Sequence, residues 1–238
     1  MKTLEEYKDW LEDIKLGKTD KYAYLDFGWE LMRSPYTAYH YSLIFDESLN
    51  EEFKNHLKSC FDKHVDAEDF LFEKLENNKD VTRQGELIFL AGQVAKKHKK
   101  KILEYAITFT DSKDDYTRDR ALIVLGWIGG VAQTKILENH LLNDTDTECR
   151  AWSASSYMQM WFNRRKVKEK AYQAFEKALP KETEPFVIAA ILDTIREIGK
   201  TKLGISQKAL DDEDMEKMLI AKEKAMRHIK RELKKINV

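Results

Sequence analysis

The sequence predicts an all-α protein in which helical hairpins stack into a single α-solenoid, an α-α superhelix. Three observations favour this fold class. Turn residues are scarce, because the 238 residues include only 9 Gly and 3 Pro, where average usage gives roughly 17 Gly and about 12 Pro. Sandwiches, barrels and Gly-rich sheets need many more turns. Apolar residues recur at helical spacing, and a two-helix unit repeats every 32 to 35 residues.

The first predicted helix has clear start and stop signals. Thr3 and Glu6 form a capping-box pair at its start. Gly17 follows its last apolar position, as expected where a C-terminal glycine ends a helix. The apolar positions between them share one helical face: Leu4, Tyr7, Leu11 and Ile14. Another helix is predicted to begin at Ser34-Pro35, where a capping residue precedes proline.

The next predicted helix covers residues 49–65. Ser48 and Glu51 form a second capping-box pair at its start. Its apolar residues are spaced to lie on one face: Phe53, Leu57, Cys60, Phe61 and Val65.

An internal repeat is the most informative feature of the chain. It is anchored on the dipeptides Thr82-Arg83, Thr117-Arg118 and Cys149-Arg150, which are 35 and 32 residues apart. Apolar residues follow each Arg at fixed offsets of four and seven: Leu87 and Leu90, Leu122 and Leu125, Ala154 and Tyr157. A fourth unit fits at Val187-Ile188, after a helix start at Glu184-Pro185, but it lacks the Arg.

A unit of this length cannot bury its apolar face alone, whereas stacked units form one continuous core. We therefore expect a single domain over residues 1–238. Within it, residues 1–79 form degenerate helical pairs, residues 80–200 the clearer repeats, and residues 201–238 the C-terminal capping helices. From Asp211 onward the apolar spacing allows one long helix or two.

Residues 114–129 (DDYTRDRALIVLGWIG) carry a specific resemblance. This stretch resembles the first helix of a short HEAT repeat, of the kind found in phycobilin-lyase-type HEAT proteins. The shared pattern is an acidic joint, a small or β-branched residue, Arg, an Ala-rich helix, and Leu-Gly-x-Ile-Gly. The next unit keeps the joint over residues 144–150 but has Tyr157-Met158 where Leu-Gly is expected. The fourth keeps Ile198-Gly199.

Physical reasoning gives the repeated positions a structural role. An Arg near a helix start can bridge to an acidic residue in the joint of a neighbouring unit and donate to the joint carbonyls. Glycines in the helix let a paired helix approach closely. We therefore interpret a set of repeat positions as structural rather than as ligand-binding: Arg83, Arg118, Arg150, Leu125 and Gly126.

Charge and cysteine content limit the function classes. The 41 Lys and Arg against 42 Asp and Glu give a net charge of −1, so a strongly basic nucleic-acid binder is not indicated. Cys60 and Cys149 cannot build a disulfide framework. The longest apolar run, Phe186 to Leu192, is far shorter than the about 20 residues of a membrane-spanning helix. We expect a soluble, cytoplasmic protein with free thiols and no membrane partner.

One side of the helix at residues 49–65 carries a possible metal-ligand set. His56, Cys60 and His64 stand at i, i+4 and i+8, and imidazole and thiolate both suit zinc. Three ligands spread over two turns are too far apart for one ion, so we favour a core-edge cysteine between solvated histidines. Phosphate-binding and hydrolase motifs are absent from the sequence. We therefore expect no catalytic residues, no metal and no cofactor.

Two basic runs occupy comparable joints of the repeat. The first is residues 96–101 and the second is residues 164–166, directly after Trp161-Phe162 and one Asn. They are either solvated joints or a positive edge for an acidic protein surface, and aromatic residues beside Arg are typical of interface anchors. The candidate partner-binding residues are Trp161, Arg164, Arg165, Lys100 and Lys101.

These observations favour a non-catalytic protein-binding module or scaffold, such as an adaptor or a toxin-immunity-type inhibitor. The expected partner is another protein with an acidic surface, rather than nucleic acid. The alternative is a nucleic-acid enzyme of the HEAT-like DNA glycosylase type, but the near-neutral chain shows no matching cluster of Trp, Asp and Arg. A bilin lyase is disfavoured, because the motif that resembles those proteins is the structural repeat and not an active site.

Overall fold

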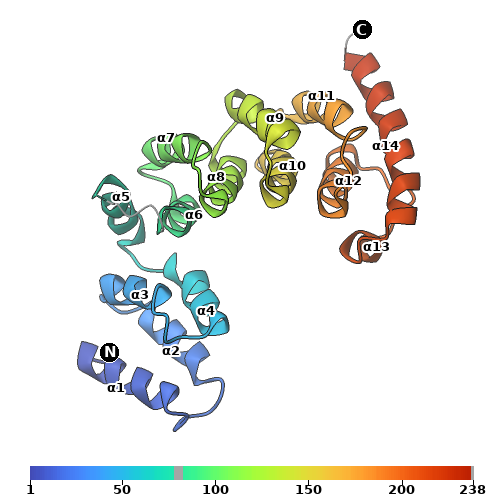
Figure 1. Cartoon of the computed structure of the whole chain (residues 1–238). Helices are drawn as coiled ribbons and strands as arrows, with labels where there is room; N and C mark the ends of the chain where they lie inside the picture. Colours follow the sequence, from blue (N-terminus) through green and yellow to red (C-terminus); the bar gives the residue numbers. More distant parts are fainter. Residues whose placement is uncertain (78–82, 237–238) are drawn as a thin grey trace.

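The computed structural model describes residues 1–77 and 83–236 and shows a curved stack of helices (Figure 1). Within these residues there are 14 α-helices, a short 3-10 helix at Val131–Gln133 and no strand, which confirms the predicted all-α solenoid. Thr82 of the first repeat anchor and the predicted boundary at residues 79–80 lie outside the described residues.

The N-terminal part contains α1 (Leu4–Lys15), α2 (Ala23–Leu31), α3 (Thr37–Ile44), α4 (Glu51–Phe61) and α5 (Ala67–Asn77). The repeats contain α6 (Gln84–Val94), α7 (Lys99–Phe109), α8 (Asp115–Ile128), α9 (Thr134–Asn143), α10 (Thr147–Phe162), α11 (Lys168–Ala178) and α12 (Pro185–Gly199). The chain then forms α13 (Gln207–Asp211) and α14 (Met215–Ile236).

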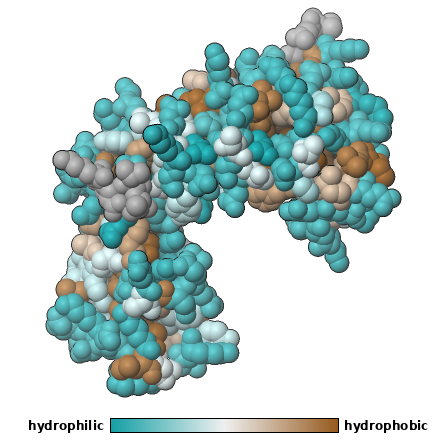
Figure 2. Space-filling model, in the orientation of Figure 1, coloured by the Kyte–Doolittle hydropathy of each residue, from teal (hydrophilic) through white to brown (hydrophobic). Residues whose placement is uncertain are grey.

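The repeats form two layers. Helices α6, α8, α10 and α12 pack on one another in order and make the inner layer of the arc, while α7, α9 and α11 cover its outer side (Figure 1). Short joints make consecutive helices antiparallel. The C-terminal ends of the inner helices therefore share one edge of the stack, the carboxyl edge, and their N-terminal ends share the opposite amino edge. On the face drawn in Figure 2 the surface is mostly hydrophilic, with scattered hydrophobic patches.

The inner layer holds the core, as the repeat register predicts. Leu122, Leu125 and Tyr157 are fully buried. Gly126 permits the closest approach of α8 and α10, because a Cβ at this position would lie 3.0 Å from the Cα of Ser156. The Ser156 hydroxyl donates to the Leu122 carbonyl at 2.8 Å, which joins the same two helices.

At the amino edge, two arginines each tie their repeat to the following joint. Arg118 donates from Nε and Nη2 to both carboxylate oxygens of Asp144 at 3.2 and 3.0 Å. Arg150 makes the corresponding pair with Glu182 at 2.9 and 3.4 Å. Each Nη1 also donates to carbonyls of the preceding joint, which belong to Ser112 and Lys113 for the first arginine and to Asp144 and Thr145 for the second.

The first repeat arginine has a different environment. The guanidinium of Arg83 lies over the ring of Phe45 at 4.9 Å, so this side chain contacts the N-terminal part of the chain. A second link across the same region is the ion pair between Lys58 of α4 and Glu86 of α6 at 2.8 Å. The N-terminal helices thus continue the stack.

Several helix ends differ from their sequence predictions. The capping box of Thr3 and the left-handed Gly17 are present at the ends of α1. However, α4 is capped by Asn50, whose side chain accepts from the backbone of Phe53, so the predicted Ser48 cap is wrong. Asn50 lies directly before the first helical residue and therefore reaches the free N–H groups.

Two further predictions about helix ends are wrong for related reasons. The Ser34-Pro35 dipeptide precedes α3 by a full residue, and Tyr36 is the residue before the helix. The Ser34 hydroxyl instead donates to the Leu31 carbonyl at 2.7 Å and closes the turn after α2. Val65 is fully exposed, because α4 ends at Phe61 and the helical spacing no longer applies.

The C-terminal region ends the stack with one long helix. Glu184 and Pro185 begin α12 as predicted. The short α13 is separate, and α14 runs without interruption over 22 residues. It packs against α11 and α12 through a buried apolar stripe: Met218, Ala221, Ala225 and Ile229.

Replacing Leu125 tests the register of the inner layer. Leu125→Ala should lower the free energy of unfolding by about 2–5 kcal/mol, because it removes buried methyl groups and leaves a cavity. Urea denaturation measures this loss. The control is Leu219→Ala on α14, where the side chain is 51% exposed and the change should stay under about 0.5 kcal/mol. An equally small loss at Leu125 would contradict this packing.

Replacing Arg118 tests the amino-edge pairs. Burial alone would raise the pKa of Asp144, but hydrogen bonds from Arg118, from the Asp146 backbone and from His140 outweigh it and lower the pKa. A lowered carboxyl pKa stabilises the folded state above the ordinary Asp pKa and loses this contribution as the pH falls through the folded value. Arg118→Met should therefore cost about 1–3 kcal/mol at neutral pH.

The difference between wild type and Arg118→Met should shrink below about pH 4, near the ordinary Asp pKa. Urea denaturation at several pH values measures it. The control is Arg227→Met, because the Arg227 side chain is 70% exposed and only loosely paired, so little change is expected. A pH-independent loss at Arg118 would show that its hydrogen bonds to the Ser112 and Lys113 carbonyls, and not the pair with Asp144, supply the stability.

Candidate functional site

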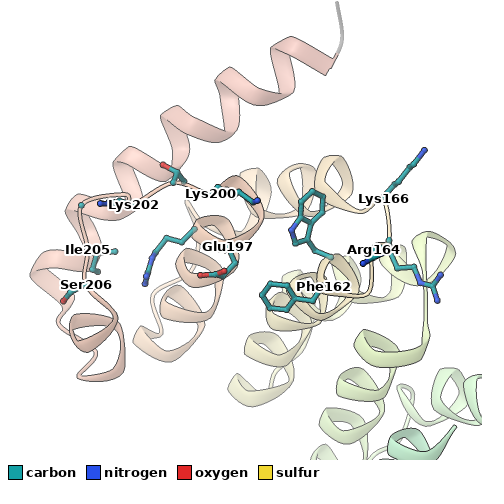
Figure 3. Close-up of a pocket in the computed structure, with 13 residues that line it drawn as sticks. Phe162, Arg164, Lys166, Glu197, Lys200, Lys202, Ile205 and Ser206 are labelled. Atoms are coloured by element: carbon teal, nitrogen blue, oxygen red, sulfur yellow. The ribbon is translucent and has the colours of Figure 1, made fainter.

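A groove of about 1190 Å³ lies at the carboxyl edge, between the ends of α10 and α12 (Figure 3). Trp161 and Phe162, the last residues of α10, form one wall. The joint of residues 164–166 continues this wall, and the end of α12 with the loop of residues 200–206 forms the opposite one. Stacking of neighbouring repeats therefore creates the groove, and no single repeat contains it.

The groove is strongly cationic. Its lining includes six basic residues, Arg164, Arg165, Lys166, Arg196, Lys200 and Lys202, and one acidic residue, Glu197. Arg196 pairs with Asp193 at 3.4 Å and donates to Gln207 at 3.1 Å. The other five basic side chains make no ion pair with any residue in the described part of the chain. Their charge is therefore available to an anionic ligand.

Aromatic side chains adjoin these charges. Trp161 is half-buried and packs against the core, whereas Phe162 is 55% exposed. Asn163 fixes the start of the joint, because its side chain donates to the Trp127 carbonyl of α8 at 3.1 Å. The groove thus combines an aromatic wall with cations that form no ion pair in the described part of the chain, the composition typical of interface anchors.

Two of the cations occupy strained backbone positions. Arg164 (φ 58°) and Lys200 (φ 48°) are left-handed, and each lies just after the last residues of an inner-layer helix. Glycine usually fills such positions, because a side chain there costs roughly 1–2 kcal/mol. Arg164 closes the end of α10 through its N–H, which donates to the Trp161 carbonyl at 2.9 Å. At both positions a charged residue stands where the left-handed backbone conformation would favour glycine.

The structure brings some of the sequence-predicted partner residues together. Trp161, Arg164 and Arg165 line the groove. Lys100 and Lys101 do not, because they lie in the first turn of α7 at another joint, and Lys101 pairs with Glu104 at 3.0 Å. This pair therefore belongs to the same edge but to a different repeat.

Sequence reasoning missed the wall contributed by α12 and the following loop. Lys200 and Lys202 stand after Ile198-Gly199, a pair of residues that by itself indicates only a repeat motif. A signal was present, since Arg164 follows the anchor Arg150 by 14 residues and Lys202 follows Ile188 of the fourth unit by the same 14. Comparing basic residues at equal offsets in successive units would have found it.

The possible metal-ligand set is not assembled. His56 Nε2 is 2.9 Å from the Leu25 carbonyl, and His64 instead lies 2.8 Å from a ring nitrogen of His40. His64 is buried, so the expectation that both histidines are solvated is wrong for it. The chain turns after α4 and carries His64 into the interior. No group of three metal-ligand side chains occurs within residues 1–77 and 83–236.

Comparison with known protein families gives one match. A family model described as HEAT repeats matches residues 68–158, from α5 to most of α10. It does not single out the phycobilin-lyase variety. Neither the curated proteins nor the solved structures include a significant match. Among the described helices, none is both long and apolar enough to cross a membrane.

Glycine substitutions test whether the groove cations are held at a cost in stability. Arg164→Gly and Lys200→Gly should each raise the free energy of unfolding by about 0.5–1 kcal/mol, because glycine adopts the left-handed conformation without strain. Urea denaturation measures the gain. Arg165→Gly is the matched control, since Arg165 is not left-handed, and it should give no gain. Destabilisation at both test positions would show that the side chains support the fold.

Proposed function

We propose that this HEAT-repeat protein is a non-catalytic binding module that holds an acidic segment of a partner protein in the carboxyl-edge groove. HEAT repeats generally mediate protein interaction or scaffolding, through the extended surface that stacked repeats provide. An adaptor and a toxin-immunity-type inhibitor would both use such a surface. We place the protein in the cytoplasm, where the two free, buried cysteines would stay reduced.

The observation that carries this proposal is a set of five cations beside Trp161 and Phe162 that have no ion pair within residues 1–77 and 83–236. Complementary charge between partners increases the association rate and the specificity, while desolvated aromatic contacts contribute much of the binding free energy. A carboxylate-rich segment with an apolar residue satisfies both features. The titratable groups in the groove are Lys, Arg and one Glu, without the His or Cys that most often supplies a base or nucleophile.

Charge reversal in the groove tests this function. Arg164→Glu together with Arg165→Glu should weaken the partner complex at least tenfold, or about 1–2 kcal/mol. The melting temperature should barely change, because exposed charges rarely contribute more than about 1 kcal/mol. The partner is first isolated with the wild-type protein as bait, and its Kd for each variant is then measured by calorimetry. Raising the salt concentration should also weaken the wild-type complex.

Lys100→Glu with Lys101→Glu is the matched control, because it reverses two charges at another joint of the same edge. It should leave the Kd nearly unchanged. Equal losses from both double variants would place the interface along the whole edge instead of in the groove. A titration with duplex DNA at low and moderate salt tests the glycosylase alternative, and tight binding at moderate salt would favour that class over a protein partner.

A further inference from the structure

We infer that the partner segment is extended and runs from the groove across the loop of residues 200–206 onto a second basic cluster on α14. This inference rests on the proposed function and specifies the shape of the partner segment. The second cluster, named here the α14 cluster, consists of Lys224, Arg227 and Arg231. It surrounds a shallow pocket of about 570 Å³ on the far side of the loop.

The two sites are continuous. Lys202 and Gly204 line both the groove and the α14 pocket. The loop between them is firmly held, because Leu203 and Ile205 are buried. Within this loop Gly204 is left-handed (φ 72°), and Lys224 Nζ occupies the space that a Cβ would need there. The lack of a side chain at Gly204 therefore lets Lys224 of α14 lie against the loop that borders the groove, which brings the two basic sites together.

The α14 cluster is open to an anionic ligand. No acidic residue lines its pocket. The nearest acidic partners are loose, since Arg227 is 3.9 Å from Glu223 and Arg231 is 3.9 Å from Glu232, and both arginine side chains are exposed. Exposed pairs of this kind contribute little and can be exchanged for a ligand. Lys224 makes no ion pair within the described residues.

The neighbouring histidine does not add to this charge at neutral pH. His228 is buried, and burial is the main cause that lowers its pKa. Its ring lies 3.1 Å from the Tyr172 hydroxyl and 3.2 Å from Arg231 Nη2. Since Arg231 can only donate, Nδ1 accepts and the neutral ring orients the guanidinium. The cationic groups facing the ligand are thus the lysines and arginines.

This layout favours an extended acidic segment over a compact ligand. The cations form a path that starts at the end of α10 and passes the end of α12 and the loop (Figure 3). The path ends at the α14 cluster. A single carboxylate can satisfy only one or two of them. An extended peptide places a side chain roughly every 3.3 Å, so a run of Asp and Glu can follow the whole path while an apolar residue contacts Phe162.

The path is tested with two fluorescein-labelled Glu-rich peptides of different length, whose affinities for the protein are compared. Each peptide has one Leu at the end that enters the groove. The short peptide has about six residues and spans roughly 20 Å, and the long one has about fifteen and spans roughly 50 Å. Fluorescence anisotropy measures their Kd. The long peptide should bind at least tenfold more tightly to the wild-type protein. Arg227→Glu with Arg231→Glu should remove this advantage and leave the short peptide unaffected.

Lys230→Glu with Lys234→Glu is the matched control, because these exposed lysines lie on the same helix but do not line the pocket. It should preserve most of the length advantage. Equal affinity for both peptides, or no effect of the Arg227 and Arg231 reversals, would overturn the inference. The proposed function would still hold if Arg164→Glu with Arg165→Glu abolished binding of the short peptide.

Two further outcomes separate the inference from its premise. If neither peptide binds the wild-type protein, the proposed function fails and the inference fails with it. If single-stranded oligo(dT) of matched charge binds much more tightly than the long peptide at moderate salt, the path is a nucleic-acid site. The identification of the ligand as a protein segment would then be wrong. Unchanged melting temperatures verify that the variants are folded.

Discussion

Each inner-layer helix depends on its neighbours to cover its apolar face, and the rest of the structure depends on this constraint. Leu122 and Leu125 of α8 are fully buried in the stack, in which α6, α7 and α10 pack against this helix. Gly126 and Ser156 set how closely α8 and α10 approach. Once these contacts fix the spacing of the helices, the positions of their ends, and hence of the groove, are determined as well.

The two edges of the stack use the same chemistry for opposite purposes. At the amino edge, Arg118 and Arg150 each have a carboxylate from the next joint within hydrogen-bond distance. These ion pairs hold neighbouring repeats together. At the carboxyl edge, Arg164 and Lys200 have no such partner in the described chain, and both take a left-handed backbone conformation. The amino-edge arginines are therefore neutralised by carboxylates of the protein itself, whereas the carboxyl-edge cations remain available to a ligand.

Much of the fold could be predicted from the sequence. Apolar spacing indicates the helices, and the offsets after each Arg indicate the repeat register, because both depend on residues close together in the sequence. The same rules failed where a contact distant in sequence decides the outcome. His64 is buried beside His40, 24 residues away, and no periodicity signals that pairing. Half of the groove was predicted from Trp161 and its basic neighbours, whereas the wall formed by Lys200 and Lys202 depends on how two repeats stack.

The tie between Arg150 and Glu182 has a mechanical consequence. It joins α10 to the joint before α12 near the start of α10, while the groove begins at Trp161 near the other end of this helix, about 17 Å from Arg150 at 1.5 Å per residue. Between these two ends α10 packs along α12, and the Thr194 hydroxyl of α12 donates to the Ala154 carbonyl of α10 at 3.3 Å. The two helices are thus held together at more than one point, so the packing of the inner layer sets the width of the groove at their ends.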